Sequence, residues 1–213
     1  MSELLRKIID DRTLYGVWKI SESVEELRSA ICLREGEEAL YNLFVAESRK
    51  KQWLAYRLLI RELLEPDEFP VEYDSSGKPF LAGSDFHISV THTDDLAAVI
   101  ISGHAKVGID IEKIRTRIEK VKDKFLNEKE SLLIGKDREL EQLTLAWCAK
   151  EALYKLHGKR NLDFRENMMV DIPPKAGMKF NGEIIFAGKR DKYQLFSEMI
   201  DGYILVYLLD AAI

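Results

Sequence analysis

Two acidic residues in the middle of the chain have the spacing of a paired carboxylate site. Residues 107–112 alternate apolar side chains with Gly108, Asp110 and Glu112, which is the period-two pattern of a β-strand. Residues two apart on a strand share a face, so Asp110 and Glu112 point the same way, and Gly108 beside them leaves room for a ligand to approach the backbone. A hard divalent cation such as Mg²⁺ suits such oxygen ligands. An edge strand with solvated acids is the alternative.

A third carboxylate follows on a predicted helix. Glu151 and Lys155 lie four residues apart within residues 147–155, so they share one helix face. A surface ion pair is one interpretation of this spacing. The other places Glu151 beside Asp110 and Glu112, with a metal ion to neutralise the three acids and Lys155 facing an anion. A metal ion with a nearby lysine is typical of phosphate or pyrophosphate chemistry, because both neutralise the leaving group.

The elements that must position these residues can be predicted from hydrophobic periodicity. The pattern predicts strands at 14–20, 86–90, 96–101, 107–112 and 203–209, and a capping box at Ser23 and Glu26 starts a short helix. Helices are predicted at 37–64, with a break near 46–48, at 121–134 and at 139–157. Two Asn-Gly or Asp-Gly pairs, at 181–182 and 201–202, predict hairpin turns.

The order of elements repeats along the chain. Trp53 is followed by Arg57 and Arg61 at four and eight residues, and Trp147 is followed at the same spacings by Glu151 and Lys155. Each triplet lies in the last long helix of its half, after a strand and a shorter helix. This repetition suggests a duplicated α+β unit that divides near residue 105.

Composition restricts the class of protein. The chain has 213 residues, of which 46% are hydrophobic and 32% charged, as expected of a globular protein. Its net charge of −5 argues against a nucleic-acid binder that relies on overall charge. Two cysteines cannot form a disulfide framework. Without a signal-peptide core near residue 1 or an apolar run of about 20 residues, we expect a cytoplasmic protein that does not enter the membrane.

The two acidic segments together resemble the signature of 4′-phosphopantetheinyl transferases. The first, Gly108-Ile-Asp-Ile-Glu112, matches (V/I)-G-(I/V)-D-x-E. The second matches (F/W)-x-x-K-E-(S/A)-x-x-K over residues 147–155, and Trp147 lies 35 positions after Glu112, within the spacing typical of the family. Further matches to the two-lobed, Sfp-type branch occur at Gly77-Lys-Pro79, at residues 89–93, in the helix that carries Arg49 and Arg57, and at residues 125–130.

This resemblance implies an enzyme that transfers 4′-phosphopantetheine from coenzyme A to a serine of an apo acyl or peptidyl carrier protein, releasing 3′,5′-ADP. It implies Mg²⁺, or Mn²⁺ in its place, held by Asp110, Glu112 and Glu151. The implied catalytic groups are Glu151, Lys155, which contacts the pyrophosphate, and Glu130 as a candidate base. The implied coenzyme A contacts are Arg49, Arg57, Lys78, Pro79, Thr91, His92, Lys150 and Lys155.

We therefore expect an α+β fold of two similar lobes related by pseudo-twofold symmetry, each a small antiparallel sheet packed on a long helix. Residues 1–105 form the N-terminal lobe with the adenosine contacts, and residues 106–213 form the C-terminal lobe with the metal and catalytic residues. Coenzyme A is expected in the cleft between the lobes, and the chain is expected to be a monomer. Two alternatives remain: a Mg²⁺-dependent phosphohydrolase, and a non-catalytic module that binds coenzyme A or a carrier protein.

Overall fold

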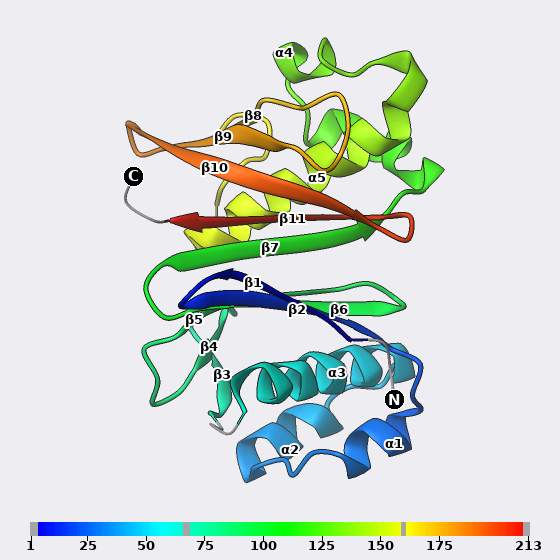
Figure 1. The fold of residues 1–213 in the computed structure, drawn as a ribbon, viewed down its shortest axis with the longest axis vertical. Helices are drawn as coiled ribbons and strands as arrows, with labels where there is room; N and C mark the ends of the chain where they lie inside the picture. The colour runs from blue at the N-terminus through cyan, green and yellow to red at the C-terminus, as the bar shows by residue number, and fades with distance from the viewer. Residues whose placement is uncertain (1–3, 66–68, 159–160, 211–213) are drawn as a thin grey trace.

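Two large antiparallel sheets, each packed on a long helix, form the fold across residues 4–65, 69–158 and 161–210, the part of the chain that this computed structural model describes (Figure 1). The first sheet has the strand order β1-β2-β6-β5 and the second has the order β7-β11-β10-β9-β8. The expected α+β class, with antiparallel sheets on long helices, is confirmed. The pseudo-twofold relation between the halves stays a prediction.

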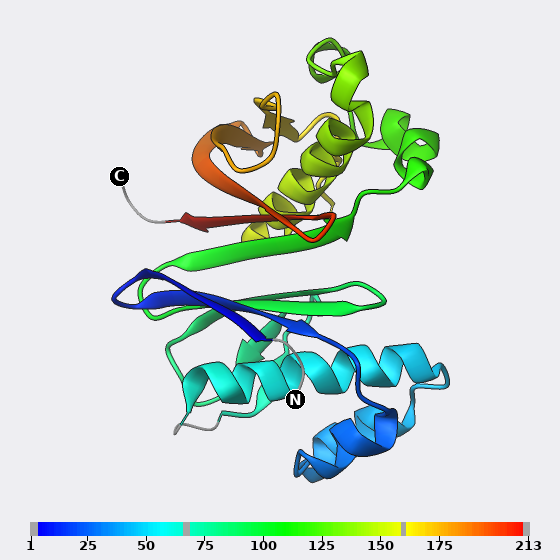
Figure 2. The same ribbon diagram turned by 45° about the vertical axis from the view of Figure 1, so that its right-hand side comes forward.

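The N-terminal half, residues 4–102, places helix α3 under its four-stranded sheet, with α1 and α2 beneath α3 (Figure 2). Helix α1 begins at the predicted capping box of Ser23 and Glu26, and the predicted break near residue 46 separates α2 from α3. The elements are β1 Leu4–Asp10, β2 Thr13–Lys19, α1 Val24–Ser29, α2 Glu35–Asn42, α3 Glu47–Leu64, β3 Val71–Tyr73, β4 Pro79–Leu81, β5 His87–His92 and β6 Leu96–Ser102.

The C-terminal half, residues 106–210, packs helix α5 against its five-stranded sheet. Helix α5 has the predicted bounds, and it ends at Gly158, whose φ of 71° is left-handed and suits a glycine C-cap. The elements are β7 Lys106–Lys113, the 3₁₀ helix η1 Thr116–Lys124, α4 Glu128–Ser131, the 3₁₀ helix η2 Lys136–Arg138, α5 Glu139–His157, β8 Met168–Val170, β9 Lys179–Phe186, β10 Lys189–Ile200 and β11 Tyr203–Asp210.

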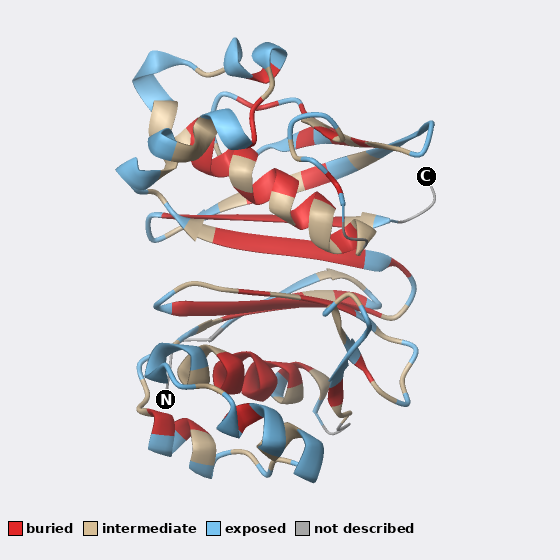
Figure 3. Cartoon of the chain, turned by 180° about the vertical axis from the view of Figure 1, so that it is seen from behind, coloured by how far each residue is buried: buried red, intermediate tan, exposed pale blue. Residues whose placement is uncertain are grey.

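An apolar core joins the two sheets, which face each other across the middle of the molecule (Figure 2). Tyr15 from β2, Ile100 from β6 and Ile109 from β7 are all buried in it. The buried strands and helices on either side of this core are visible in Figure 3. None of the helices in the described ranges has both the length and the apolar character that crossing a bilayer requires.

The secondary structure differs from the predictions in several places. Strand β1 was not predicted, because its charged residues hid the β pattern. Residues 121–134 form the end of η1 and the short helix α4 rather than one helix. The predicted turn at Asn181-Gly182 lies inside β9, where a Cβ on Gly182 would be 2.7 Å from Leu195 Cδ1, so this glycine makes room for packing. The actual turn between β9 and β10 is Ala187-Gly188, whose φ angles are 51° and 77°.

Helix α5 crosses strand β7 so closely that only glycine fits at the crossing. A Cβ on Gly108 would lie 3.0 Å from the carbonyl carbon of Ala152 and closer still to its oxygen. Backbone atoms cannot move away as a flexible side chain can, so the sequence must have glycine there. The expectation that Gly108 leaves room for a ligand was wrong, since the space is filled by the helix.

We predict that Gly108→Ala lowers the free energy of unfolding by more than about 2 kcal/mol, because the new methyl group forces α5 away from β7. The control is Gly36→Ala in α2, where a Cβ meets nothing within 4 Å. That variant should raise the free energy of unfolding by about 0.5 kcal/mol, since alanine loses less backbone entropy on folding. Urea denaturation measures both, and equal stability of the two variants would contradict the argument.

Candidate active site

Asp110 on β7 is the centre of a buried polar cluster between β7, β5 and α5. Its side chain is almost completely buried. Oδ1 accepts hydrogen bonds from Lys155 Nζ at 2.7 Å and from Thr91 Oγ1 at 2.8 Å. Oδ2 is buried and has no hydrogen-bond partner among the described residues. One oxygen is thus fixed by the protein, and the other is left for a ligand.

Glu112 and Glu151 share the electrostatic environment of Asp110. Burial, followed by the charge of Asp110, raises the pKa of Glu151 to about 7. The same two causes, in the same order, raise the pKa of Glu112, and a hydrogen bond with Trp147 opposes the shift. The three predicted carboxylates therefore lie within electrostatic range of one another, and their mutual repulsion favours a cation beside them.

The described residues contain no group of three histidine, cysteine, aspartate or glutamate side chains close enough to form a ready metal centre. The cation nearest Asp110 is the ammonium group of Lys155, at 2.7 Å. The donor set nevertheless fits a hard divalent ion, because all three side chains supply oxygen and Asp110 Oδ2 has no partner in the part of the chain that the structure describes.

Strand β5 supplies residues from the other half of the molecule. Ser89 and Thr91 share its face toward β7, where Ser89 Oγ accepts from the backbone N–H of Ile109 at 3.2 Å. Thr91 was predicted to contact a phosphate, and in the structure its hydroxyl holds Asp110. Ser89 was not among the predicted site residues, although its position two residues before Thr91 on a strand places it on the same face.

Arg49 and His92 form a second polar pair at the end of β5. Arg49 Nη1 lies 2.7 Å from His92 Nε2. Burial, then the charges of Arg49 and Lys155, lower the pKa of His92 to about 4. The ring is therefore neutral at pH 7, and because arginine can only donate, Nε2 accepts. The guanidinium of Arg49 is exposed, and the charges of Lys155 and Asp110 both act on His92, so this pair lies near the Asp110 cluster.

A cavity of about 220 Å³ opens between the halves beside Lys155. Lys78 and Pro79 line it from the N-terminal half, and Tyr154 and Lys155 line it from α5. Lys78 Nζ donates to the backbone oxygens of Lys155 at 2.7 Å and Leu156 at 3.3 Å. The structure thus places the predicted Gly-Lys-Pro segment at the cavity wall, with its lysine turned onto the end of α5.

The expected phosphate contact by Lys150 was wrong. Lys150 is completely buried and donates to Glu130 Oε2 at 2.6 Å and to three backbone oxygens, those of Phe125, Phe164 and Met168. The expectation that Glu130 is a general base was also wrong, because its second oxygen accepts from Val170 N–H and both oxygens are shielded from solvent. This pair joins α4 and the segment before β8 to α5.

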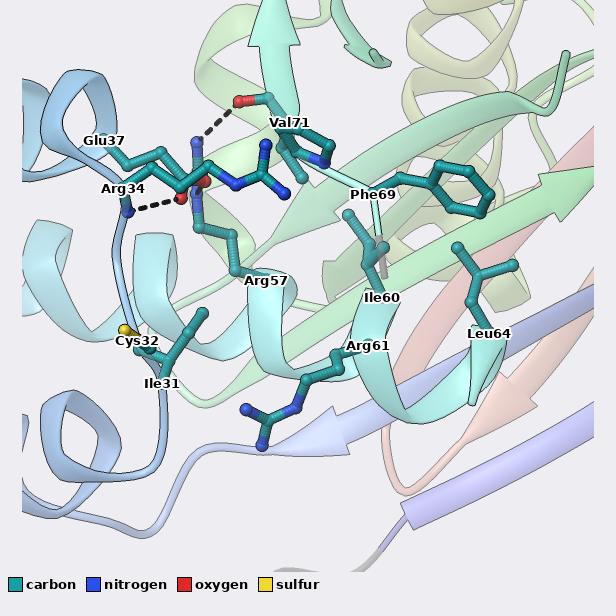
Figure 4. Close-up of a pocket in the computed structure, with 11 residues that line it drawn as sticks. Ile31, Cys32, Arg34, Glu37, Arg57, Ile60, Arg61, Leu64, Phe69 and Val71 are labelled. Atoms are coloured by element: carbon teal, nitrogen blue, oxygen red, sulfur yellow. Dashed lines mark hydrogen bonds and ion pairs between the residues drawn. The ribbon is translucent and has the colours of Figure 1, made fainter. Parts of the chain in front are cut away.

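The expected coenzyme A contact by Arg57 was wrong as well. Its guanidinium is buried, stacks 3.4 Å from the Trp53 ring centroid, and donates to Glu37 Oε1 at 3.1 Å. It also donates to Tyr56 and to the backbone oxygen of Val71. Figure 4 shows Arg57 in the wall of a separate pocket of about 100 Å³ in the N-terminal half. Its donors are occupied there, so Arg57 is a structural residue.

We predict that Lys150→Met destabilises the protein by about 3–5 kcal/mol, because it leaves the Glu130 carboxylate buried without a counter-charge. Adding Glu130→Gln should recover about 1–3 kcal/mol of that loss, since the amide needs no counter-charge. The exposed neighbour Lys129 is the control, and Lys129→Met should change stability by less than about 0.5 kcal/mol. Thermal and urea unfolding measure all three. A stable Lys150→Met variant that fails only in ligand binding would contradict the structural role.

Comparisons with known proteins match this part of the chain. Residues 106–207 match the model of the 4′-phosphopantetheinyl transferase superfamily. Over 116 residues the chain is 32% identical to the 4′-phosphopantetheinyl transferase AcpT of Salmonella typhi, covering 52% of this chain and 60% of that protein. It is 27% identical over 144 residues to the 4′-phosphopantetheinyl transferase HetI of Nostoc, covering 61% of each chain. It is 26% identical over 149 residues to the 4′-phosphopantetheinyl transferase gsp of Aneurinibacillus migulanus, covering 66% of this chain and 62% of that protein.

The chain thus spans about 60% of the length of the curated relatives that it matches. The superfamily match begins at the first residue of β7 and ends within β11. It therefore includes Asp110, Glu112, Glu151 and Lys155, the residues that form the buried cluster on the C-terminal side of the cavity. Residues 106–207 are thus similar to the 4′-phosphopantetheinyl transferase superfamily.

Proposed function

We propose that the protein transfers 4′-phosphopantetheine from coenzyme A to a serine of an apo acyl or peptidyl carrier protein in the cytoplasm. The observation that carries this proposal is the Asp110 cluster. Lys155 and Thr91 hold one carboxylate oxygen of Asp110, and the other has no partner among the residues described. Asp110 and Lys155 lie within the segment that matches the superfamily, and Thr91 lies before it. Lys155 also lines the cavity beside the cluster.

The topology of the two halves supports the two-lobed, Sfp-type branch. In each half a strand carrying a glycine, Gly16 on β2 or Gly108 on β7, lies against the long helix that follows. The chain then returns as a hairpin, β5–β6 or β10–β11, whose last strand pairs antiparallel with that first strand. We infer lobes of residues 1–105 and 106–213 related by a pseudo-twofold axis. Because the apolar core between the sheets lies within one chain, the protein acts as a monomer.

The cavity between the halves is the proposed coenzyme A site. Pro79 and Tyr154 supply its apolar walls, and Lys155 faces the pyrophosphate. The exposed guanidinium of Arg49, held by neutral His92, suits the 3′-phosphate, because a guanidinium donates to two phosphate oxygens at once. Thr91 acts by fixing Asp110 rather than by touching the substrate.

Asp110, Glu112 and Glu151 would hold Mg²⁺, or Mn²⁺ in its place. When bound, the ion supplies neutralising charge at the coenzyme A pyrophosphate. In the proposed reaction the carrier serine oxygen forms a bond to the β-phosphorus, and the bond from that phosphorus to the oxygen of 3′,5′-ADP breaks. Lys155 donates a hydrogen bond to the pyrophosphate. Because Glu130 is buried in its pair with Lys150, we propose that the serine proton goes to a different base, for which Glu151 is the candidate.

We predict that the protein adds the mass of one phosphopantetheine group to an apo carrier protein in the presence of coenzyme A and Mg²⁺. EDTA should abolish the transfer, and Mg²⁺ or Mn²⁺ should restore it. Asp110→Ala and Glu151→Gln should lower turnover about a hundredfold or more, and Glu112→Gln should be milder, because an amide oxygen or water replaces the lost ligand. Glu62→Gln, an exposed carboxylate on α3, is the control.

Mass spectrometry of the carrier and a phosphate assay distinguish the alternatives. Release of free phosphate without a modified carrier would indicate a phosphohydrolase. Binding of coenzyme A with neither product would indicate a non-catalytic module. Full activity of Glu151→Gln would contradict the proposed metal site.

A second prediction concerns the 3′-phosphate. Arg49→Ala should weaken binding of coenzyme A by about 1.5–3 kcal/mol and leave binding of dephospho-coenzyme A nearly unchanged, because it removes charged hydrogen bonds to the 3′-phosphate. The neighbouring Lys51→Ala serves as the control, since Lys51 pairs with Glu47 on the same helix. Calorimetry with the two ligands measures the difference. Equal losses for both ligands would assign the 3′-phosphate to other residues.

A further inference from the structure

The carboxyl end of helix α5 is capped by a side chain from the other half of the molecule. The last carbonyl oxygens of a helix have no partner within it. At this end Gly158 N–H bonds to the oxygen of Tyr154, and Lys78 Nζ donates to the oxygens of Lys155 and Leu156. An ammonium group at this position also interacts favourably with the negative end of the helix dipole.

The turn that presents Lys78 is held rigidly by its own hydrogen bonds. Asp74 Oδ1 accepts from the backbone N–H groups of Ser76 and Lys78, both at 2.9 Å. Gly77 has a φ of 84°, which a side chain would strain. Ser76 Oγ lies 2.6 Å from Asp74 Oδ1 and 3.1 Å from the oxygen of Gly158. Its single proton serves one of them at a time, so Lys78 supplies the main cap.

Lys155 is therefore held at two points from opposite sides. Its backbone oxygen accepts from Lys78 Nζ, and its own Nζ donates to Asp110 Oδ1 and to the backbone oxygen of Ile109 at 3.1 Å. If the cap is lost, the last turn of α5 is free to fray, because its carbonyls lose their partner. The Lys155 side chain would then lose its fixed position relative to Asp110.

We propose that Lys78 is a positioning residue, which acts through the last turn of α5 to place Lys155, rather than a ligand of the coenzyme A phosphates. The kinetic part of this proposal rests on the proposed transferase function. The structural part does not, because the cap is present in the protein without substrate.

The kinetic test compares Lys78→Met, which keeps the apolar stem and removes the donor, with Lys106→Met. Lys106 is an exposed lysine that lines the same groove as Lys78. Lys78→Met should lower kcat about tenfold or more, as expected when a catalytic group shifts by a fraction of an ångström. The KM values for coenzyme A and dephospho-coenzyme A should change less than about twofold. Lys106→Met should alter none of these values. A rise in KM confined to coenzyme A, with kcat retained, would overturn the proposal and make Lys78 a 3′-phosphate ligand.

Amide hydrogen exchange provides a readout that needs no enzymatic activity. In the free protein, Lys78→Met should speed exchange at Leu156, His157 and Gly158 by at least about fivefold, and Lys106→Met should not. Lys78→Arg, which retains a donor, should keep most of the protection, and it replaces the methionine variant if that variant does not fold. The proposed cap would be refuted if exchange in Lys78→Met were unchanged. It would also be refuted if Lys78→Arg lost as much protection as Lys78→Met. Absence of transfer in the unmodified protein would refute the proposed function alone.

Discussion

The close crossing of helix α5 over strand β7 is the constraint on which the rest of the site depends. With no side chain at Gly108, the backbone of Ala152 comes into contact with the strand. The residue next to Ala152, Glu151, and the residues about one turn before and after it, Cys148 and Lys155, all interact electrostatically with Asp110. Burial, followed by the charges of Asp110 and Glu112, raises the pKa of the Cys148 thiol. Cys148 is therefore a packing residue beneath the site rather than a reactive thiol. A wider crossing would separate the helix residues from the strand carboxylates.

Two lysines of helix α5, Lys150 and Lys155, each pair with a carboxylate, and the two pairs have different roles. Lys155 lies five positions after Lys150, so the two side chains point to different sides of the helix. Lys150 is fully buried and donates to four acceptors, which are Glu130 and three backbone oxygens. This arrangement suits a residue that fixes the surrounding loops. Lys155 is a quarter exposed beside the cavity, and Oδ2 of its partner Asp110 is buried with no hydrogen-bond partner among the described residues. Of these two pairs, only the second has a charged group that a ligand in the cavity can contact, because Lys150 is fully buried.

The site belongs to both halves because the edge strands β5 and β7 lie side by side. Side chains of β5 link them, since Ser89 accepts from the Ile109 backbone and Thr91 donates to Asp110. The apolar core between the sheets holds these strands in place, and the Lys78 cap adds a third connection at the end of α5. A polar cluster that depends on both halves is fixed by the packing of the whole chain rather than by one motif.

The sequence by itself determined the local pattern of the site. Alternation placed Asp110 and Glu112 on one strand face, and helical spacing predicted the bounds of α5 with Glu151 and Lys155 on one side. Only the tertiary structure decided which charged residues are buried and what they contact. Lys150, Glu130 and Arg57 matched family positions, yet their donors and acceptors are satisfied inside the protein. The physical reason is that periodicity describes faces of single elements, whereas burial and hydrogen-bond partners depend on residues distant in sequence, as Lys150 and Glu130 are by 20 positions.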